Sequence, residues 1–253
     1  MLVSNAYYAP GDQRAAKVND LFTRIARRYD FINDLQSFGL HRWWKRRVVV
    51  LAQAKSGDRA LDLCCGTGDI SFALARSGAQ TTGLDFSARM LEVAANRGQK
   101  SEARNQNKNH PPSAIRHPQF LQGDAQQLPF ADHSFDIVTV GYGLRNLTSW
   151  ERGLDEMWRV ARPGARLIVL DFGKPANALW RGIYFAHLKM SVPLMGWLFC
   201  GDASAYAYIL ESLKNYPAQL AVAQKMRRLQ LADIRVINLL GGAMAINYAV
   251  KPR

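Results

Sequence analysis

The chain has 253 residues, of which 48% are hydrophobic and 21% are charged. This length accommodates one well-buried α/β domain with additions, and the composition is that of an ordinary globular protein. No stretch approaches the roughly 20 consecutive apolar residues that a membrane-spanning helix needs, so we expect no membrane span.

A formal net charge of +13 is the unusual bulk property of the sequence. It predicts attraction to polyanions, either nucleic acid or the anionic face of a membrane, and does not choose between them. The first residues lack the basic and apolar regions of a signal peptide, so we expect a cytoplasmic protein. Its association with the inner face of the membrane is left open. Cys64, Cys65 and Cys200 form no CxxC pair, which suits a reducing compartment, and we expect no metal site.

The first predicted elements are helices. Apolar side chains recur at intervals of three and four over residues 14–29, and a second helix over 41–53 mixes tryptophan with arginine and lysine. Residues 1–13 show no periodicity. We expect residues 1–55 to form a helical cap over a substrate and residues 56–253 to form the main domain.

Strand and helix patterns then alternate, which predicts βαβ units and a parallel sheet. The predicted strands cover residues 59–63, 80–85, 119–122, 135–140 and 166–172, and the predicted helices cover 69–76, 88–97 and 150–160. The polar, asparagine-rich residues 98–118 are expected to form a surface insertion. A turn is predicted at residues 162–165.

The alternation fails after residue 173. A helical insertion is expected at about 174–230, with helices at 176–189, 205–213 and 217–231. Residues 234–240 and 243–250 flank Gly241-Gly242, which predicts a β-hairpin. Five alternating units closed by a hairpin favour an α/β fold of the class I S-adenosylmethionine-dependent methyltransferase type (Rossmann-like) over a dehydrogenase domain.

The turn Gly66-Thr67-Gly68 follows the first predicted strand and opens a helix. Glycines let the backbone turn sharply and approach a ligand, and a helix N-terminus adds N–H donors. The first βα turn of such a fold is the usual place for a nucleotide-like cofactor. A dinucleotide-binding turn needs a third glycine where this chain has Ser71, so the pattern favours S-adenosylmethionine, which has no phosphate.

Acidic residues lie beside this turn and after the next two strands. Asp62 and Asp69 flank the glycines and could hold the cofactor's ammonium group directly or through water, although Asp69 could equally cap the helix. Asp85 ends the second strand, where an acid accepts hydrogen bonds from both ribose hydroxyls. Asp124, after the third strand, is expected near the adenine amino group. These acids together indicate a nucleoside site.

Longer motifs resemble the ubiquinone/menaquinone biosynthesis C-methyltransferase family. They lie at residues 29–44, 143–146 (Gly-Leu-Arg-Asn), 159–167, 202–206, 212 and 216–217, and the resemblance spans about 14–250. The resemblance implies methyl transfer from S-adenosylmethionine to a ring carbon of a polyprenylated quinol. Demethylmenaquinol is the first candidate for this acceptor. The benzoquinol step of the ubiquinone route is the alternative. Residues that match the family's cofactor contacts are Thr67, Asp85, Asp124 and Ala125.

The sequence departs from the family at several positions. Gly141 stands where the family often has a serine associated with cofactor contact, and Asp171 replaces a glutamate. Residues 98–118 are also longer than usual. None of these changes removes a charge that the chemistry requires, so the expected site consists of Asp62, Gly66, Thr67, Gly68, Asp85, Asp124, Ala125 and Gly141 for the cofactor.

Methylation at carbon requires an electron-rich ring, which a quinol supplies once a hydroxyl loses or shares its proton. Arg145, on the loop after the strand at 135–140, would lower the pKa of that hydroxyl, and Asn146 would hold the other ring oxygen. Arginine is a poor base, so the proton is expected to leave through water that Tyr29 or His41 orients. A structural salt bridge for Arg145 and a packing or capping role for His41 are the alternatives.

The aromatic part of the helical insertion has two interpretations. Its aromatic residues could line the entry of a prenyl tail or contact an anionic membrane peripherally, and a lid packed on the sheet is an equal alternative. These residues are Trp180, Tyr184, Phe185, Trp197 and Phe199. A homodimer is also left open.

Two competing functions come from other classes. The net charge suggests a nucleic-acid methyltransferase, but the loop at 141–146 lacks the motifs of an enzyme that flips bases, so no nucleic acid is expected. A non-catalytic quinone- or lipid-binding scaffold is the other, and the acids at the cofactor positions argue against it.

Overall fold

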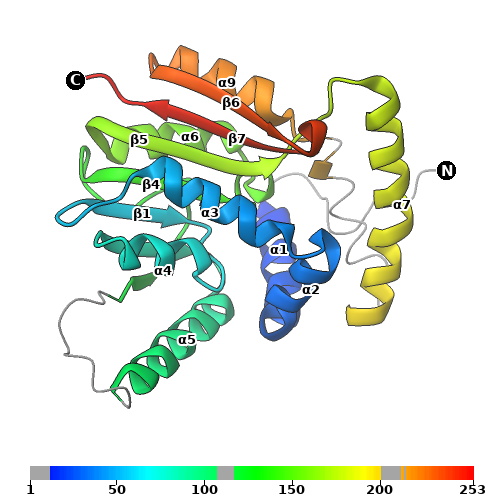
Figure 1. Ribbon diagram of the computed structural model, residues 1–253, viewed down its shortest axis with the longest axis horizontal. Helices are drawn as coiled ribbons and strands as arrows, with labels where there is room; N and C mark the ends of the chain where they lie inside the picture. Colours follow the sequence, from blue (N-terminus) through cyan, green and yellow to red (C-terminus); the bar gives the residue numbers. More distant parts are fainter. Residues whose placement is uncertain (1–11, 107–116, 201–211, 214) are drawn as a thin grey trace.

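The computed structural model describes residues 12–106, 117–200, 212–213 and 215–253. Helices precede the sheet: α1 (Asp12–Ile25), a 3₁₀ turn η1 (Ala26–Arg28), α2 (Tyr29–Ser37) and α3 (Leu40–Ala52). The remaining helices are α4 (Asp69–Arg76), α5 (Ala88–Gln106), η2 (Leu144–Asn146), α6 (Trp150–Val160), α7 (Ala178–Cys200), α9 (Ala218–Arg228) and η3 (Leu240–Gly242). Figure 1 shows them around one central sheet.

Seven strands form this sheet in the order β3-β2-β1-β4-β5-β7-β6. The strands are β1 (Arg59–Leu63), β2 (Gln80–Asp85), β3 (Gln119–Gln122), β4 (Phe135–Gly141), β5 (Ala161–Phe172), β6 (Ala232–Leu239) and β7 (Met244–Val250). The first five run parallel, while β7 is antiparallel to both β5 and β6. The strand order reverses between β1 and β4, which creates a ligand crevice at their carboxyl ends. The predicted fold class is confirmed.

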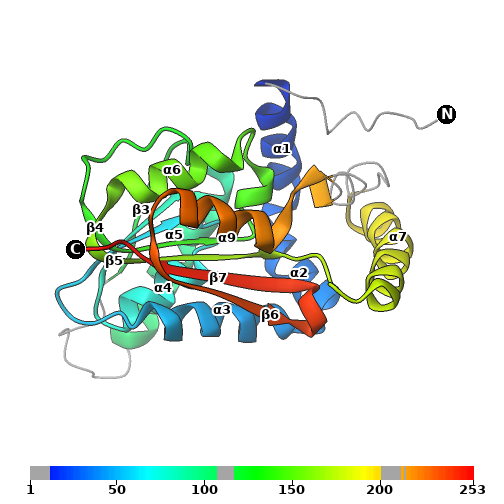
Figure 2. The same cartoon turned by 90° about the horizontal axis from the view of Figure 1, so that it is seen from above.

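Helices cover both faces of the sheet, with α3 and α4 on one side and α6 and α9 on the other (Figure 2). Neighbouring residues of β1 face opposite layers: Ala60 packs in the cluster that contains Trp44 and Val48 of α3, and Leu61 packs in the cluster of α6 and α9. Such two-sided burial is typical of parallel sheets. Within residues 1–55, therefore, α3 belongs to a layer against the sheet.

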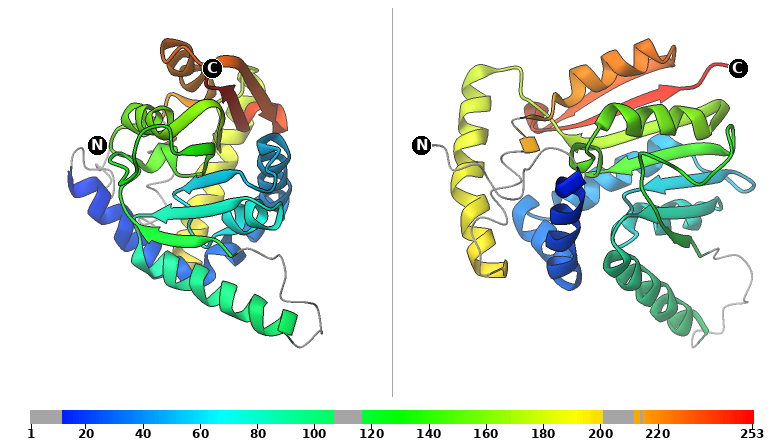
Figure 3. Two further views of the ribbon diagram at one scale, coloured as in Figure 1. Left: turned by 90° about the vertical axis from the view of Figure 1, so that its left-hand side faces the viewer. Right: turned by 180° about the vertical axis from the view of Figure 1, so that it is seen from behind.

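α1, α2 and α7 lie beyond the carboxyl ends of the parallel strands, as the two views of Figure 3 and the arrowheads in Figure 1 show. Val18, Leu21 and Ile25 of α1 share an apolar cluster with Ile32 of α2 and Leu188 of α7. This third, smaller cluster stands over the ligand crevice. No helix in the described ranges is both long and apolar enough to cross a membrane.

The structure corrects four predictions at the level of elements, one of which is the helix at 176–189, since α7 continues to Cys200 with Pro193 inside it. A separate helix, α2, lies between the two predicted N-terminal helices, where none was expected. It ends where Phe38 and Gly39 adopt left-handed backbone angles (φ 50° and 75°). α5 continues to Gln106, so the first part of the predicted insertion is helical, because Gln, Lys, Glu, Ala and Arg are good helix formers. Residues 107–116 lie outside the description.

The fourth correction concerns residues 162–165, which lie inside β5 instead of preceding it. Ala161 pairs with Phe135 and Arg166 pairs with Ile137, so the intervening residues form a bulge in the strand. The C-terminal hairpin is confirmed, with Leu239 opposite Met244. The predicted helix at 205–213 and the motif at 202–206 fall outside the described residues, apart from 212–213.

Candidate functional site

A pocket lies at the carboxyl ends of β1, β2 and β4, where the strand order reverses. We call it the strand-end pocket; its lining includes Cys64, Gly66, Leu84, Asp85, Ser87, Met90, Asp124, Ala125, Gly141, Tyr142, Asn146 and Tyr29. Five of the eight predicted cofactor residues are therefore brought together here. These five residues lie at or just after the carboxyl ends of four strands, β1, β2, β3 and β4.

Asp85 fixes the geometry of the glycine turn. Its Oδ2 accepts a hydrogen bond from the Gly66 N–H (2.8 Å) and its Oδ1 accepts one from the Ser87 N–H (2.9 Å). Burial raises the pKa of Asp85, and these backbone donors oppose the rise. Asp124 is held similarly, because its Oδ1 accepts the Gln126 N–H at 2.8 Å. Both carboxylates are oriented by the backbone before any ligand binds.

The two glycines of the turn have different surroundings. Gly66 has φ 55°, and a Cβ there would lie 3.9 Å from Cε1 of Tyr29, so the turn faces the Tyr29 ring. Gly68 has φ 85°, and a Cβ there would lie 2.9 Å from Cζ of Phe120 and 3.0 Å from Cε2 of Phe72. Gly68 is thus required for backbone conformation and packing, and it is not among the residues that line the strand-end pocket.

Thr67 connects the turn to α2. Its Oγ1 donates to Oδ1 of Asp30 (2.8 Å), and its carbonyl accepts a hydrogen bond from Arg97 (2.8 Å). Only 2% of Thr67 is exposed. Its hydroxyl therefore serves a contact between protein segments, whereas the resemblance implied a contact with the cofactor.

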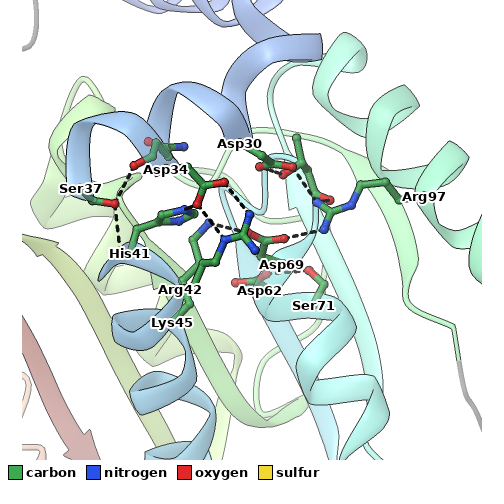
Figure 4. Close-up of polar contacts among 12 residues, drawn as sticks. Asp30, Asp34, Ser37, His41, Arg42, Lys45, Asp62, Asp69, Ser71 and Arg97 are labelled. Carbon is green, nitrogen blue, oxygen red and sulfur yellow. Dashed lines mark hydrogen bonds and ion pairs between the residues drawn. The ribbon is translucent and has the colours of Figure 1, made fainter. Parts of the chain in front are cut away.

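Asp62 and Asp69 are both engaged by protein groups (Figure 4). Asp62 accepts hydrogen bonds from Ser71 Oγ (2.6 Å) and Thr139 Oγ1 (2.8 Å), and burial raises its pKa to about 6. Asp69 pairs with Lys45 Nζ at 2.8 Å and Arg97 Nη2 at 2.7 Å. Burial disfavours its charge, but these two cations outweigh burial and hold its pKa well below the ordinary value.

A second, more apolar cavity of about 320 Å³ adjoins the first. We call it the helical cavity, since α1, α2, α3 and α7 supply most of its wall. Its polar lining residues include Tyr29, His41, Tyr142 and Arg145. Tyr29 and Tyr142 line both cavities, so the two spaces meet at these aromatic rings.

Arg145 is 92% buried at the edge of the helical cavity, with 8% exposed. Its backbone N–H donates to Oδ2 of Asp171 (3.0 Å), and its Nε lies 3.4 Å from Oδ1. Its guanidinium carbon stands 4.7 Å from the centre of the Phe172 ring. The ion pair that we considered as an alternative role is present, and the same side chain also lines the cavity.

Asn146 lies beside Arg145 but on the other cavity. Its Oδ1 accepts a hydrogen bond from Arg145 Nη1 (2.7 Å), and its Nδ2 donates to the Tyr142 carbonyl (3.2 Å). Asn146 lines the strand-end pocket and Arg145 lines the helical cavity. The pair therefore spans the boundary between them.

Tyr29 and His41 complete the predicted catalytic set. Burial raises the pKa of Tyr29 and lowers the pKa of His41. His41 is 3% exposed, and its Nε2 lies 2.8 Å from Oδ1 of Asp34. All four predicted catalytic residues thus gather around the meeting point of the two cavities or line one of them.

Sequence reasoning missed three residues at this site: Asp34, Tyr142 and the cation Lys45. Asp34 and Lys45 lie inside or just beyond the motif at 29–44, but no role was assigned to them. Tyr142 belongs to the loop at 141–146, where a positive φ of 62° turns its side chain toward the cavities. An aromatic residue directly after a buried strand was the signal available for it.

Comparisons with known proteins show which family the chain belongs to. Residues 11–251 match the sequence profile of the ubiE/COQ5 methyltransferase family. The chain is 42% identical over 246 residues to a demethylmenaquinone methyltransferase of Desulfitobacterium hafniense (strain Y51), covering 96% of this chain and 93% of that relative. It is 37% identical over 247 residues to a ubiquinone/menaquinone biosynthesis C-methyltransferase UbiE of Stutzerimonas stutzeri (strain A1501), covering 96% and 92%.

Solved structures share the fold at lower identity. A SAM-dependent methyltransferase from Aquifex aeolicus has a TM-score of 0.56 at 16% identity and covers 83% of this chain and 91% of its own. A SAM-dependent methyltransferase from Thermotoga maritima has a TM-score of 0.59 at 18% identity, with 92% and 99% covered. Since the family profile and both relatives match nearly the whole chain, this protein belongs to the ubiE/COQ5 methyltransferase family.

Proposed function

We propose that this methyltransferase moves the methyl group of S-adenosylmethionine to a ring carbon of a polyprenylated quinol, with demethylmenaquinol as the principal acceptor. The observation that carries the proposal is the pair of adjoining cavities that share Tyr29 and Tyr142. One has carboxylates suited to a nucleoside, and the other is apolar enough for a ring and its tail. The names of both relatives support a quinone substrate, and the benzoquinol is the second candidate.

The strand-end pocket fits S-adenosylmethionine in its chemistry. Asp85 and Asp124 offer acceptors to the ribose hydroxyls and the adenine amino group, and Leu84 and Met90 offer an apolar surface for the base. Ser87 Oγ is buried there without a hydrogen-bond partner among the described residues, so a ligand hydroxyl can satisfy it. The bound donor supplies an electrophilic methyl group.

The acceptor is proposed to lie in the helical cavity with one hydroxyl near Arg145. A phenolic hydroxyl has a pKa of about 10, and a buried guanidinium beside it favours the anion. The anion pushes electron density onto the neighbouring ring carbon. Tyr29 stands where the two cavities meet and would align that carbon with the methyl group, and alignment of this kind is worth roughly 7–11 kcal/mol.

The rim of the helical cavity supports a further proposal, peripheral contact with an anionic membrane. Phe38 is 85% exposed on this rim and Trp180 is 38% exposed. Arg42 and Arg46 of α3 line a neighbouring pocket that shares His41 with the helical cavity. A long prenyl tail could then pass from bilayer to cavity without crossing water. Trp197 and Phe199, expected in the same role, lie among the side chains outside the description.

The division of labour within the chain stays a proposal as well. Residues 1–55 are proposed as the helical cap over the acceptor, with α1 and α2 covering the cavities and α3 anchoring the cap on the sheet. Residues 56–253 are proposed as the domain that binds the donor. We place the protein in the cytoplasm, working at the inner face of the membrane.

Transfer of labelled methyl tests the proposed reaction. The purified full chain is incubated with S-adenosylmethionine carrying a labelled methyl group and, separately, with a reduced demethylnaphthoquinol and a reduced benzoquinol, each with a prenyl tail. Mass spectrometry locates the added methyl group on the ring. We expect a higher kcat/KM with the naphthoquinol, and absence of ring methylation with both acceptors would contradict the proposal.

A further inference from the structure

The last turn of α2 and the first turn of α3 bring two side chains together at the wall of the helical cavity. The left-handed residues Phe38 and Gly39 reverse the chain between these helices. Nε2 of His41 consequently lies 2.8 Å from Oδ1 of Asp34, although seven positions separate them (Figure 4). We propose that Asp34 and His41 form a proton-accepting pair, in which Asp34 fixes the imidazole and Nδ1 of His41 receives the hydroxyl proton of the acceptor.

Asp34 is a carboxylate that stays ionised. Arg42 donates from Nε to Oδ1 of Asp34 at 2.7 Å and also bonds to its Oδ2. The hydrogen bond from Arg42, followed by that from His41, holds the pKa of Asp34 below its ordinary value. An ionised carboxylate only accepts hydrogen bonds. The proton of neutral His41 therefore sits on Nε2, and Nδ1 carries the lone pair.

Nδ1 of His41 is the unsatisfied end of this pair. The atom is buried and has no hydrogen-bond partner among the described residues, while the ring lines the helical cavity. A buried acceptor without a donor costs about 1–3 kcal/mol. A hydroxyl that enters the cavity as a donor would recover this cost, so the site favours an acceptor that presents O–H.

The electrostatic surroundings keep His41 neutral and able to accept a proton. Burial lowers its pKa, and Lys45 on α3 lowers it further, whereas Asp34 on α2 and Asp69 on α4 raise it. The N-terminal end of α3 also disfavours a cation on its first turn. Arg42, on the same turn, acts mainly through its bonds to Asp34.

The other titratable groups of the cavity are less suited to the task. Burial raises the pKa of Tyr29, of Tyr142 and of Tyr184, so these phenols stay protonated near neutral pH. Arg145 is a cation and cannot act as a base. His187 on α7 also lines the cavity but is exposed, whereas His41 is 97% buried, so only His41 is shielded from water.

The proton transfer to His41 rests on the proposed function. Nδ1 takes the hydroxyl proton, and the ring carbon beside the oxyanion forms a bond to the methyl carbon while the methyl–sulfur bond gives its electron pair to sulfur. The methylated ring carbon then loses its hydrogen as a proton, and the oxygen regains one. One proton in total leaves for solvent, through the imidazolium of His41.

Substitution of each partner tests the pair. A general base contributes about 10²–10⁴-fold, so we expect His41→Gln and Asp34→Asn to lower kcat within that range. In Asp34→Asn an amide N–H can point at Nε2 and place the ring proton on Nδ1. KM for the donor and donor affinity by calorimetry should change less than threefold, since neither residue lines the strand-end pocket.

The pH profile separates a proton acceptor from a structural contact. Asp34 raises the pKa of His41. In Asp34→Asn the acid limb of the kcat–pH profile should therefore move to lower pH, and the maximum kcat should fall. Asp34→Glu should restore part of the rate. Asp233→Asn makes the same chemical change at an exposed ion pair, with Arg235 on β6, and serves as the control with unchanged kcat.

The outcomes distinguish this inference from the proposed function. No ring methylation by the wild-type chain would overturn both. Methylation by the wild type, with an unmoved acid limb and a kcat within threefold in His41→Gln and Asp34→Asn, would overturn the pair alone. A shift of the acid limb of the kcat–pH profile, together with unchanged donor affinity, supports the Asp34–His41 pair.

Discussion

Arg145 and Asp171 form a buried ion pair across the carboxyl edge of the sheet, with 8% and 3% of the two side chains exposed. The contact is double, because the backbone N–H of Arg145 also donates to the same carboxylate. Burial raises the pKa of Asp171 and Arg145 opposes that rise. Asp171 of β5 therefore fixes both the position of the loop that carries Arg145 and the orientation of the Arg145 guanidinium.

Replacement of Arg145 by alanine should lower quinol turnover by orders of magnitude and leave donor affinity nearly intact by calorimetry. It also leaves Asp171 without its cation, which costs about 3–5 kcal/mol of unfolding free energy. The double variant Arg145→Ala/Asp171→Asn should regain stability but not turnover. Loss of donor affinity in the single variant would contradict the assignment of Arg145 to the acceptor.

Asp85→Ala should weaken donor binding. The carboxylate orders the Gly66 and Ser87 N–H groups and is proposed to accept the ribose hydroxyls, and hydrogen bonds to a charged group are worth about 1.5–3 kcal/mol each. We expect at least about a tenfold increase in the donor dissociation constant, measured by calorimetry. Asp132→Ala, at an exposed pair with Arg159, is the control. Equal affinity in both variants would be evidence against a ribose contact.

Asp62 should make stability depend on pH in the opposite sense to an ordinary surface acid. Its folded pKa of about 6 lies above the ordinary 3.8, so the folded state binds more protons between these values. The contribution of Asp62 to stability is then fully present below pH 3.8 and declines as pH rises to about 6. The change amounts to about 3 kcal/mol for a fully buried group.

Urea unfolding of wild type and Asp62→Asn at pH 4, 5, 6 and 7 measures this effect. The amide fits the same hydroxyls of Ser71 and Thr139, since each hydroxyl can donate or accept. The difference in unfolding free energy between the two proteins should change by roughly 2 kcal/mol between pH 4 and pH 7, because part of the full change lies below pH 4. A constant difference would show that Asp62 keeps its charge throughout.

Phe38→Ser tests the proposed membrane contact at the rim of the helical cavity. We expect less flotation with vesicles that contain anionic lipid, because Phe38 is 85% exposed at this rim and can insert its ring at the membrane interface. KM should rise for a long-tailed quinol and stay constant for a short-tailed one. Leu220→Ser, on α9 and 74% exposed, is the control. Failure of the wild type to bind any vesicle would remove the membrane proposal.

Local sequence patterns were sufficient for most of the fold. Apolar residues recur at intervals of two in strands and of three and four in helices, and residues close together in the chain produce both patterns. Every strand was therefore predicted within a few residues, except the bulged start of β5. The glycine turn, Asp85 and Asp124 could be predicted as one site because parallel strands end at one edge. The extension of α5 was missed, since its polarity alone does not distinguish an exposed helix from a loop.

The sequence by itself thus determined the order of the elements, the edge of the sheet at which the strand-end pocket lies and the family motifs. Only the tertiary structure decided which polar groups meet: Thr67 with Asp30, Arg145 with Asp171, and Asp34 with His41. Spacing along the chain carries no information about such pairs, because packing of helices and strands that are distant in sequence sets their distances. Burial, which shifts the pKa values of Asp62 and His41, likewise exists only once these layers have closed.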